Sequence, residues 1–472
     1  MNIVHIAGEA APFVQTGGLG MVIEKLSAAQ ARAGNLVRVC IPYYLLVSED
    51  APATLDTGIK INVSAGDREY EFSVYASVVN NVEYLLFSNA ELFSRGGIYG
   101  TGDFDYSDND IRYATFSQAC LFFLAEGCRS FDVIHCHDWQ AGLVPLYSSL
   151  IFRDMKWRTV FTVHDINYQG LFQRMDLDEL NLPQEVYSIE GLEFYGQISF
   201  LKAGLVYVDV LTTVSPAYAE DIQSEGFAGG MEGVVKRYAN KLRGVLSGID
   251  YNIWNPKADP LIPYPEKLDK SWKQKCKDAL ANDFDIDIEK PLFLTIGRMS
   301  NRKGIELLID SAERLATKDA NFFVLGHGDK FYARIIKKLP ENFSNFFIHL
   351  KYDHELAHRL FAAADFILSP SVYEPFGSSH LIGTRYGAVP IIYLAGGAKD
   401  TIKVFHQDGT AIVMEEYTVA ELLCKIDKAV ELYGTEELIE KVSKTAEKAD
   451  YSWERTAAEY REIYLPFGGG GT

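Results

Sequence analysis

Short apolar runs alternate with longer amphipathic segments along the first half of the chain. Residues 2–8 form an apolar run that ends at a glycine, and residues 22–33 carry apolar side chains at helical spacing up to Gly34. Further short apolar runs lie at 36–43, 132–135 and 158–164. This alternation of strands and helices predicts a parallel, doubly wound α/β sheet.

The same alternation begins again after a break in the middle of the chain. Residues 255–267 contain four prolines and show no clear hydrophobic period, which is typical of a linker between domains. Beyond this linker we expect a helix over 304–316 and strands over 291–297, 322–326, 346–350, 366–370 and 389–393. We therefore expect two α/β domains with a cleft between them, with ligands at the carboxyl ends of the strands.

The length and charge of the chain agree with this division and limit the partners. The chain has 472 residues, whereas a single hydrophobic core stops growing at about 250–300 residues. Its 45 Lys and Arg residues against 64 Asp and Glu residues give a net charge of −19. This charge disfavours nucleic acid and anionic lipid as partners, and an anionic substrate would need a local basic cluster.

The spacing of the cysteines and the hydropathy of the chain exclude further classes of protein. The six cysteines are widely spaced and form no C-x-x-C pair, which excludes zinc ribbons and thioredoxin-like chemistry and indicates reduced thiols. No apolar run approaches the ~18–20 residues of a membrane span, and the first residues lack the features of a signal peptide. We therefore expect a cytoplasmic protein with no membrane partner. The glycine-rich residues 468–472 predict a flexible tail.

Two polar clusters follow apolar runs of the first half. The loop 15–20, with paired glycines at Gly17 and Gly18, separates the first strand from the first helix; such a loop either exposes its amides to a phosphate or forms a plain turn. The segments 135–140 and 162–165 place histidines and aspartates at the ends of two strands. They fit either a metal site or the binding of sugar hydroxyl groups, and no acidic residue stands at the spacing of a known metal motif.

Two clusters of the second half predict an anion site. Arg298 and Lys303 lie in a loop that leaves a buried strand and begins a helix, and two such cations suit a diphosphate. Glu374 precedes a Gly-Ser-Ser run whose amides suit a phosphate, while its carboxylate suits sugar hydroxyl groups. The alternatives are a solvated basic loop and ordinary helix capping. A second glycine-rich loop follows at 395–400.

In their order along the chain, these motifs resemble those of bacterial glycogen synthase and plant starch synthase, a family of retaining glucosyltransferases. The resemblance spans nearly the whole chain, and the ordered set is far more specific than any one motif. In the first half it rests on the segments 15–20, 137–139, 161–164, 168–172, 192–196, 200–204, 213–216 and 248–256. In the second half it rests on Arg298 with Lys303, 357–359, Glu374 with Pro375, and 385–390.

The resemblance implies the GT-B fold, which has two facing Rossmann-like domains. An acceptor-side domain is expected over 1–254, a nucleotide-sugar domain over 255–450, and a helix that crosses back to the first domain over 451–467. The implied activity is transfer of glucose from a nucleotide-glucose, above all ADP-glucose, to the non-reducing end of an α-1,4-glucan. The reaction would proceed with retention and would need no cofactor and no metal. The sequence indicates no particular oligomeric state.

The functional residues of the family carry over onto matching positions. Arg298 and Lys303 would neutralise the leaving diphosphate, on which negative charge grows as the glycosyl–phosphate bond breaks. Glu374 would lie beside the donor sugar, and Asp138 and His164 would hold the glucose. The other implied substrate-binding positions are Gln15, Gly17, Gly18, Tyr99, Trp139, Ser247, Tyr352 (beside the donor base), Phe376, Gly377, Ser378 and Ser379.

Several positions depart from the family pattern. They are Gln15 in place of Lys, Met21 in place of Asp, Asp165 and Ser247 each in place of Asn, and Phe376 in place of Cys. Loss of a charge-assisted hydrogen bond of ~1.5–3 kcal/mol at Gln15 would lower donor affinity or rate about ten- to a hundredfold. The alternatives are therefore a retaining transferase with another nucleotide-sugar or acceptor, and a weakly active or inactive glucan-binding homologue.

Overall fold

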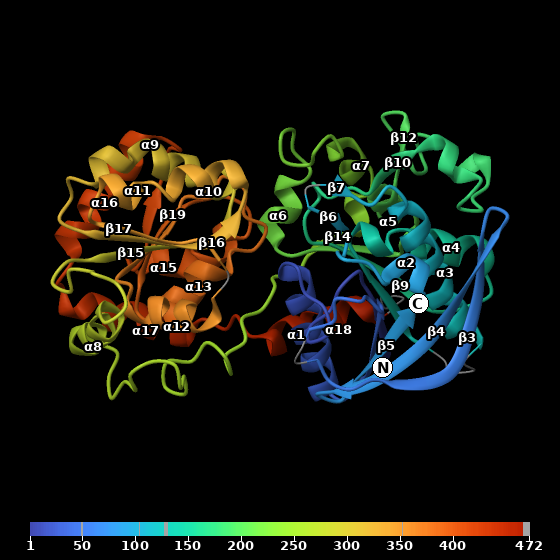
Figure 1. Ribbon diagram of the computed structural model, residues 1–472, viewed down its shortest axis with the longest axis horizontal. Helices are drawn as coiled ribbons and strands as arrows, with labels where there is room; N and C mark the ends of the chain where they lie inside the picture. The colour runs from blue at the N-terminus through green and yellow to red at the C-terminus, as the bar shows by residue number, and fades with distance from the viewer. Residues whose placement is uncertain (49–50, 103, 127–130, 352, 466–472) are drawn as a thin grey trace, which may run out of the picture. The chain divides into compact units, whose positions relative to one another are not determined.

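The computed structural model describes residues 1–48, 51–102, 104–126, 131–351 and 353–465. The chain divides into two compact units: unit 1 contains Met1–Gly248 and the segment from Trp453 onward, and unit 2 contains Ile249–Ser452 (Figure 1). Residues 249–254, which we expected in the first domain, belong to unit 2, because Ile249 lies in its core and Trp254 packs against that core.

Unit 1 is built on a sheet that has nine strands among the described residues, in the order β14-β13-β9-β8-β1-β2-β5-β4-β3. From β14 to β5 all neighbours pair in parallel. The parallel strands are β1 (Asn2–Ile6), β2 (Leu36–Pro42), β5 (Val82–Ser88), β8 (Val133–His137), β9 (Arg158–Val163), β13 (Val210–Thr213) and β14 (Leu242–Gly244). The strand order runs outward in both directions from β1 and β8, which marks the switch point where open α/β sheets bind ligands.

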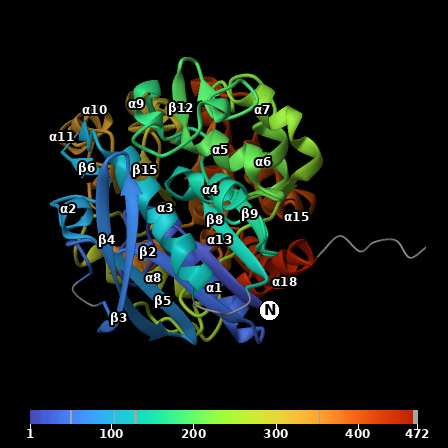
Figure 2. The same ribbon diagram turned by 90° about the vertical axis from the view of Figure 1, so that its right-hand side faces the viewer.

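Helices cover both faces of this sheet. The face with Ile3 and Val133 packs against α1 (Gly18–Arg32) and α18 (Trp453–Tyr464). The opposite face packs against α5 (Phe200–Tyr207), where Gly204 lies against the ring of Phe161. Figure 2 shows α3 (Asn109–Glu126) and α4 (Leu143–Ile151) beside each other on this side. The shorter helices are α2 (Ala90–Phe93), α6 (Pro216–Asp221) and α7 (Glu232–Arg237).

An antiparallel hairpin, which we did not expect from the sequence, extends the sheet beyond β5. It consists of β3 (Leu55–Ala65) and β4 (Arg68–Val79), and β4 pairs antiparallel with β5. The first six residues of β3 are exposed, so this strand lacks the buried apolar run that marks the parallel strands. Short strands form two smaller sheets: β6 (Gly100–Thr101) with β7 (Phe104–Asp105), and β10 (Leu171–Gln173) with β12 (Gln197–Ser199) and β11 (Glu193–Phe194).

Unit 2 has a parallel sheet of six strands among the described residues, in the order β17-β16-β15-β18-β19-β20. The strands are β15 (Leu292–Met299), β16 (Asn321–Gly328), β17 (Phe346–His349), β18 (Phe366–Ser369), β19 (Val389–Tyr393) and β20 (Ile412–Met414). Numbered along the chain, this order is the 3-2-1-4-5-6 of a Rossmann sheet. Its switch point lies between β15 and β18, and the strands that we predicted in this half are all present.

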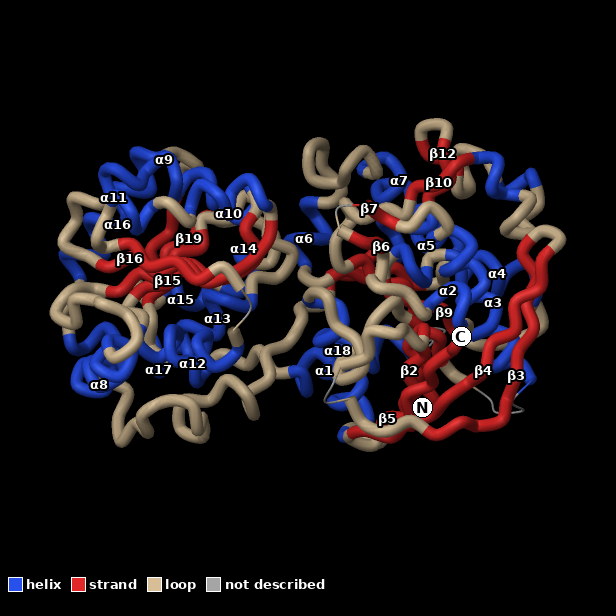
Figure 3. Tube along the Cα trace, viewed as in Figure 1, coloured by secondary structure: helices blue, strands red, loops and turns tan. Residues whose placement is uncertain are grey.

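The sheet of unit 2 lies between two helical layers (Figure 3). One layer contains α9 (Ile305–Leu315), α10 (Lys330–Ile336), α11 (Leu339–Asn342) and α16 (Val419–Leu432). The other contains α8 (Lys270–Ala281), α12 (His354–Ala363) and α13 (Ser378–Arg385). The remaining helices are α14 (Ala398–Thr401), α15 (Lys403–Gln407) and α17 (Glu436–Lys448).

Helix α18 follows unit 2 in the chain but completes the core of unit 1. Its Trp453 packs so closely on Gly248 that a β-carbon there would lie 2.7 Å from the indole ring. Its Thr456 hydroxyl donates a hydrogen bond to the Leu246 carbonyl at 2.8 Å. Among the described residues, none of the helices has both the length and the apolar character that crossing a bilayer requires.

Candidate active site

The strand ends at the switch point of unit 1 lead into acidic residues. Glu9 lies three residues beyond β1, and Asp138 follows β8 directly. β1 and β8 are neighbours in the sheet, and β9, which His164 follows, lies next to β8. The sheet therefore brings the predicted residues Asp138 and His164 to one edge. Glu9 reaches the same edge, although no sequence motif singled it out.

Asp138 is held in a strained and buried position. Its φ is 53°, which residues other than glycine adopt rarely and which is found most often at functional sites. Its Oδ1 accepts a hydrogen bond from the backbone N–H of His164 at 2.7 Å. Burial raises the pKa of Asp138 to about 8, and the nearby carboxylates of Asp165 and Glu9 add to this effect. At neutral pH a protonated Asp138 can therefore donate a hydrogen bond to a ligand oxygen.

His164 is a neutral imidazole at the same edge. Burial lowers its pKa to about 3, and its Nε2 lies 3.0 Å from Nδ1 of His137. The next residue, Asp165, accepts hydrogen bonds from the backbone and the side chain of Asn167, at 3.0 and 2.8 Å. Asp165, which departs from the family pattern, thus stabilises the turn that contains it.

The paired-glycine loop is fastened by Glu9. The buried carboxylate of Glu9 accepts hydrogen bonds from the backbone N–H of Thr16 at 2.5 Å and from its hydroxyl at 3.0 Å. Gln15 is exposed, and its amide donates to the carbonyl of Gly17 at 3.1 Å. Helix α1 begins at Gly18 after an N-cap at Gly17 that makes no side-chain hydrogen bond to it. Such a helix start offers backbone N–H groups to an anion.

Two of the predicted substrate-binding residues belong to an aromatic cluster. The ring centroids of Tyr99 and Trp139 are 6.1 Å apart, and Tyr113 lies 4.9 Å from Trp139. Burial, and then the charge of Glu9, raises the pKa of Tyr99 well above its ordinary value. Gly170 has a φ of +56°, and a β-carbon there would lie 2.7 Å from the Trp139 ring. These contacts fix the position of the Trp139 ring, whose residue directly follows Asp138 in the chain.

Ser247 lies three residues beyond the end of β14. It is buried, and its backbone N–H donates to the carbonyl of Val214 at 3.1 Å. Over the described ranges we find no hydrogen bond from its hydroxyl to Asp138, His164 or Trp139. Its predicted contact with the substrate stays a prediction. Tyr352 lies outside the described residues.

In unit 2 a pocket lies at the switch point between β15 and β18. Its lining contains Arg298 from the last residues of β15, Lys303 from the loop after β15, and Glu374 and Ser379 from the segment after β18. These four residues come from two separate motifs of the sequence, and the strand order brings them together. The backbone of the loop requires glycine, because Gly304 has a φ of +73° and a β-carbon there would lie 2.3 Å from the carbonyl oxygen of Pro370.

Lys303 and Glu374 form an ion pair inside this pocket. The Lys303 Nζ lies 2.5 Å from Oε2 of Glu374, and the Ser371 hydroxyl donates to the same oxygen at 3.3 Å. The carboxylate is almost fully buried, whereas about a third of the lysine side chain is exposed. A buried carboxylate is therefore balanced by a cation that can still reach a ligand.

The second glycine-rich loop supports the backbone of Glu374. The Glu374 carbonyl accepts a hydrogen bond from the N–H of Gly397 at 2.8 Å. Gly396 has a φ of +51°, and a β-carbon there would lie 2.0 Å from that carbonyl oxygen. The sequence showed this segment only as a second glycine-rich loop, and in the structure its backbone contacts fix the position of Glu374.

In the segment after Glu374, one residue packs against the core of unit 2 and another lines the pocket. Phe376 packs its ring against the core of unit 2, so its side chain is a structural anchor. Gly377 has a φ of +85° and is the N-cap of α13, without a side-chain hydrogen bond to the helix. Ser378 and Ser379 supply the first N–H groups of α13, and Ser379 lines the pocket. These amides can bind an anion or a sugar hydroxyl.

Comparisons with known proteins agree with this arrangement. The chain matches the family model described as starch synthase catalytic domain over residues 2–237, and the glycosyl transferases group 1 model over residues 277–449. It is 35% identical to a glycogen synthase of Thermodesulfovibrio yellowstonii, with 98% of this chain and 97% of the relative covered. It is 37% identical to a glycogen synthase of Aquifex aeolicus, with 98% of each chain covered.

Two solved structures share the fold. The catalytic domain of starch synthase IV from Arabidopsis thaliana, bound to ADP and acarbose, matches with a TM-score of 0.89, 26% identity and 98% of each chain covered. A sucrose-phosphate synthase from Thermosynechococcus elongatus matches with a TM-score of 0.62, 17% identity and 98% of each chain covered. The second likeness is one of fold alone.

Two Rossmann-like units with a cationic pocket at one switch point define a glycosyltransferase of the GT-B fold. The chain belongs to the glycogen and starch synthase family of glucosyltransferases, which move glucose from a nucleotide-glucose to a glucan. The predictions of family, fold class and enzyme class are thereby confirmed.

Proposed function

We propose that this protein transfers glucose from ADP-glucose to the non-reducing end of an α-1,4-glucan, with retention of anomeric configuration and without a metal ion. The observation that carries the proposal is the convergence of Arg298, Lys303 and Glu374 in one pocket of unit 2. The ADP and acarbose bound to the plant starch synthase relative support adenine as the base and a glucan as the acceptor.

The pocket of unit 2 suits the departing half of the donor. When the glycosyl–phosphate bond breaks, positive charge grows on the sugar ring and negative charge grows on the diphosphate. Arg298 and Lys303 would stabilise that negative charge, as fixed cations do best in a water-poor site. Lys303 is already positioned by Glu374 at 2.5 Å, so the lysine needs little rearrangement to bind a phosphate oxygen.

Glu374 and α13 suit the sugar of the donor. Glu374 can accept hydrogen bonds from glucose hydroxyl groups, since an ionised carboxylate only accepts. The uncapped amides at Gly377 and Ser378 would bind the remaining hydroxyls or a phosphate oxygen. Two cations near the diphosphate would take the place of a divalent metal, which is why we propose a metal-independent reaction.

Unit 1 would supply neutral groups to the reacting glucose. Asp138 with its raised pKa can donate a hydrogen bond, and neutral His164 can accept one. Neutral groups suit a sugar, because they bind its hydroxyl groups without placing a positive charge beside the cationic transition state. Trp139 would add an aromatic surface beside them.

The decisive test is an assay of nucleotide release. The protein would be incubated with ADP-glucose or UDP-glucose, with and without glycogen, and both nucleotide release and primer elongation measured. We expect release from ADP-glucose that depends on glycogen. Release without elongation would indicate another acceptor, and no release from either donor would contradict the proposal and favour a glucan-binding homologue.

A pair of glutamate variants ties the activity to the pocket. Glu374→Gln should lower turnover at least about a hundredfold, since the pocket loses the charge that positions Lys303. The matched control is Glu437→Gln, because Glu437 is an exposed glutamate of the same unit. Equal turnover of the two variants would remove Glu374 from the proposed catalytic residues.

A further inference from the structure

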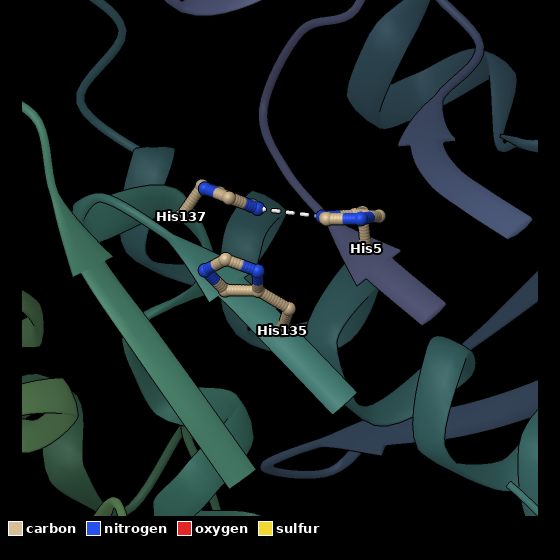
Figure 4. A group of neighbouring side chains, drawn as sticks. All are labelled: His5, His135 and His137. Carbon is tan, nitrogen blue, oxygen red and sulfur yellow. Dashed lines mark hydrogen bonds between the residues drawn. The ribbon is translucent and has the colours of Figure 1, made fainter. Parts of the chain in front are cut away.

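A group of buried histidines lies at the switch point of unit 1 (Figure 4). His5 is on β1, and His135 and His137 are on β8. His5 and His135 are paired in register, and alternate residues of a strand point to the same face, so all three share one face of the sheet. Their side chains are fully buried. The proposed function uses none of them directly.

Hydrogen bonds join two of these histidines into a chain that ends at His164. The Gln30 Oε1 lies 2.7 Å from Nε2 of His5. Nδ1 of His5 lies 2.9 Å from Nε2 of His137, which Figure 4 marks with a dashed line. Nδ1 of His137 lies 3.0 Å from Nε2 of His164. The chain of hydrogen bonds therefore runs from helix α1, along one face of the sheet, to the candidate active site.

Every ring in this chain is neutral and must donate at one nitrogen and accept at the other. Burial lowers the pKa of His5 to about 4, that of His164 to about 3, and that of His137 well below its ordinary value. A neutral imidazole has one N–H and one lone pair. The direction of the first hydrogen bond therefore sets the direction of all the others.

Gln30 sets that direction. Its carbonyl oxygen faces His5, so Nε2 of His5 donates to it and Nδ1 of His5 is left to accept from Nε2 of His137. By the same rule Nδ1 of His137 accepts from Nε2 of His164. His164 then carries its proton on Nε2 and keeps the lone pair of Nδ1.

Tyr464 of helix α18 binds the other end of the Gln30 amide and connects it to a second branch of hydrogen bonds. The Gln30 Nε2 donates to the Tyr464 hydroxyl at 2.9 Å. That hydroxyl donates in turn to Nδ1 of His135 at 2.7 Å, and Nε2 of His135 donates to the Thr162 hydroxyl at 2.6 Å. If the amide were turned over, each hydrogen bond in both branches would reverse.

We propose that Gln30 and Tyr464 are positioning residues that act through His5 and His137 to hold His164 with its proton on Nε2, so that Nδ1 is presented as an acceptor to a hydroxyl group of the sugar. The role of the sugar rests on the proposed function above. The tautomer itself follows from the hydrogen bonds of the unliganded protein and does not depend on activity.

A bound metal ion is the competing use of the same residues. One nitrogen from each of His5, His135 and His137 lies within 4.8 Å of the others, and their neutrality would suit a metal. However, Nδ1 of His5 and Nε2 of His137 already share a hydrogen bond, which a metal would have to break. The hydrogen-bonded chain satisfies these nitrogens without an ion.

The first test is the ¹⁵N NMR spectrum of the unliganded full-length protein labelled at histidine, with signals assigned by single His→Gln variants. We expect a protonated Nε2 and an unprotonated Nδ1 for His5, His137 and His164. A proton on Nδ1 of His164 would overturn the proposal. Stoichiometric zinc in the protein, with a spectrum that changes when a chelator removes it, would overturn it as well.

The second test perturbs the far end of the chain. Gln30→Met keeps the side-chain volume but removes the acceptor for His5, and Tyr464→Phe removes the hydroxyl that accepts the Gln30 Nε2 hydrogen bond. Tyr460→Phe is the matched control, since the Tyr460 hydroxyl is also buried on α18 but bonds Thr162 and Thr212 instead of Gln30. We expect both tautomers of His164 in the first two variants and one in the control.

Turnover should follow the tautomer. In Gln30→Met and Tyr464→Phe, kcat should fall about two- to fivefold, because a misplaced proton removes one hydrogen bond to the sugar, while the KM of the donor changes less. Circular dichroism checks that each variant is folded. A single unchanged tautomer in both variants would overturn the proposal. A wild-type protein with the expected tautomer but no transferase activity would remove only the proposed function.

Discussion

The parallel strands of the two units share the order 3-2-1-4-5-6 along the chain, but the side chains at the two switch points differ in their chemistry. In unit 2 the switch point between β15 and β18 leads into a pocket lined by Arg298, Lys303 and Glu374. In unit 1 the switch point between β1 and β8 is filled by His5, His135 and His137, all of which are neutral because they are buried. One switch point gathers cations around a carboxylate, and the other is filled by neutral imidazoles.

Under the proposed function, this difference would correspond to the two halves of a nucleotide-sugar. A diphosphate needs cations, whereas a glucose ring needs hydrogen-bonding groups without net charge. Position in the fold alone does not determine what a switch point binds, since strand ends with the same topology present different side chains. The predictions below test this division of roles between the units.

The largest effect is expected from the cation in the pocket of unit 2. Lys303→Met removes a charged partner of the diphosphate and leaves Glu374 buried without it, and a charge-assisted contact is worth ~1.5–3 kcal/mol. We expect kcat/KM to fall about a hundredfold or more in steady-state assays with ADP-glucose. The matched control is Lys337→Met, at an exposed lysine of the same unit. Comparable losses in both variants would contradict a special role for Lys303.

In unit 1 the second effect appears in the pH dependence of stability. The pKa of Asp138 is about 8 in the folded protein, against 3.8 for an unperturbed aspartate, so the folded state binds more protons than the unfolded state between these values. Stability should therefore fall as pH rises from about 4 to 8, by up to about 1.4 kcal/mol per pH unit from this residue.

Asp138→Asn isolates that contribution. The asparagine cannot ionise but keeps an oxygen for the His164 N–H, so the stability of the variant relative to wild type should increase from pH 5 to pH 8. Thermal unfolding followed by circular dichroism at several pH values measures this. We also expect lower turnover, because the amide is a poorer match for a donating carboxyl group. A constant difference between variant and wild type would show that Asp138 is ionised at neutral pH.

A smaller effect is expected behind the unit 2 pocket. Gly396→Ala places a β-carbon 2.0 Å from the Glu374 carbonyl oxygen at a φ of +51°, so we expect a loss of about 1–3 kcal/mol in stability and a shifted Glu374 with reduced kcat. Gly409→Ala is the control, since its φ is +66° but its nearest neighbour is a lysine tip at 3.9 Å. If both variants lost the same activity, strain alone would explain the result.

The smallest effect is expected at the neutral glycine loop of unit 1. Gln15→Lys gives up a hydrogen bond to its own loop at 3.1 Å and adds a cation where the family has one. We expect donor affinity to increase by no more than about tenfold in calorimetry with ADP-glucose. Unchanged affinity would show that position 15 does not reach the phosphates, and Gln15→Met would serve as the uncharged comparison.

Much of the fold could be predicted because buried parallel strands are apolar on both faces. The runs at 2–8, 36–43 and 158–164 coincide with β1, β2 and β9. The hairpin of β3 and β4 could not be predicted in this way, since its outer part is exposed and has no apolar run. Local hydrophobicity therefore identifies a strand only where the tertiary structure buries it.

The candidate site was predicted where function lies in a short motif after a strand. Lys303 and Glu374 came from separate motifs, and their ion pair could not be read from either. The partly buried ring of Phe376 packs on the core of unit 2, which the motif did not indicate, and its contact with the substrate stays a prediction.

The sequence contained no motif for residues that act on the site through other residues. Gln30 and Tyr464 are 434 positions apart in the sequence, and in the structure the Gln30 Nε2 lies 2.9 Å from the Tyr464 hydroxyl oxygen. Each is one polar residue on an otherwise ordinary amphipathic helix, and neither lies beside a recognisable motif. A polar residue on the buried face of a helix is the one clue that could have drawn attention to Gln30.

The return of helix α18 to unit 1 has a consequence for the order in which the protein is made. Unit 2 lies between the two segments of unit 1 in the chain, so every residue of unit 2 has been synthesised before Trp453, Tyr460 and Tyr464 exist. Until then α1 alone covers the face of the unit 1 sheet that carries Ile3 and Val133, and the part of this core that α18 supplies is missing. Translation therefore completes the chain of unit 2 first, and unit 1 cannot complete its core until helix α18 has been made.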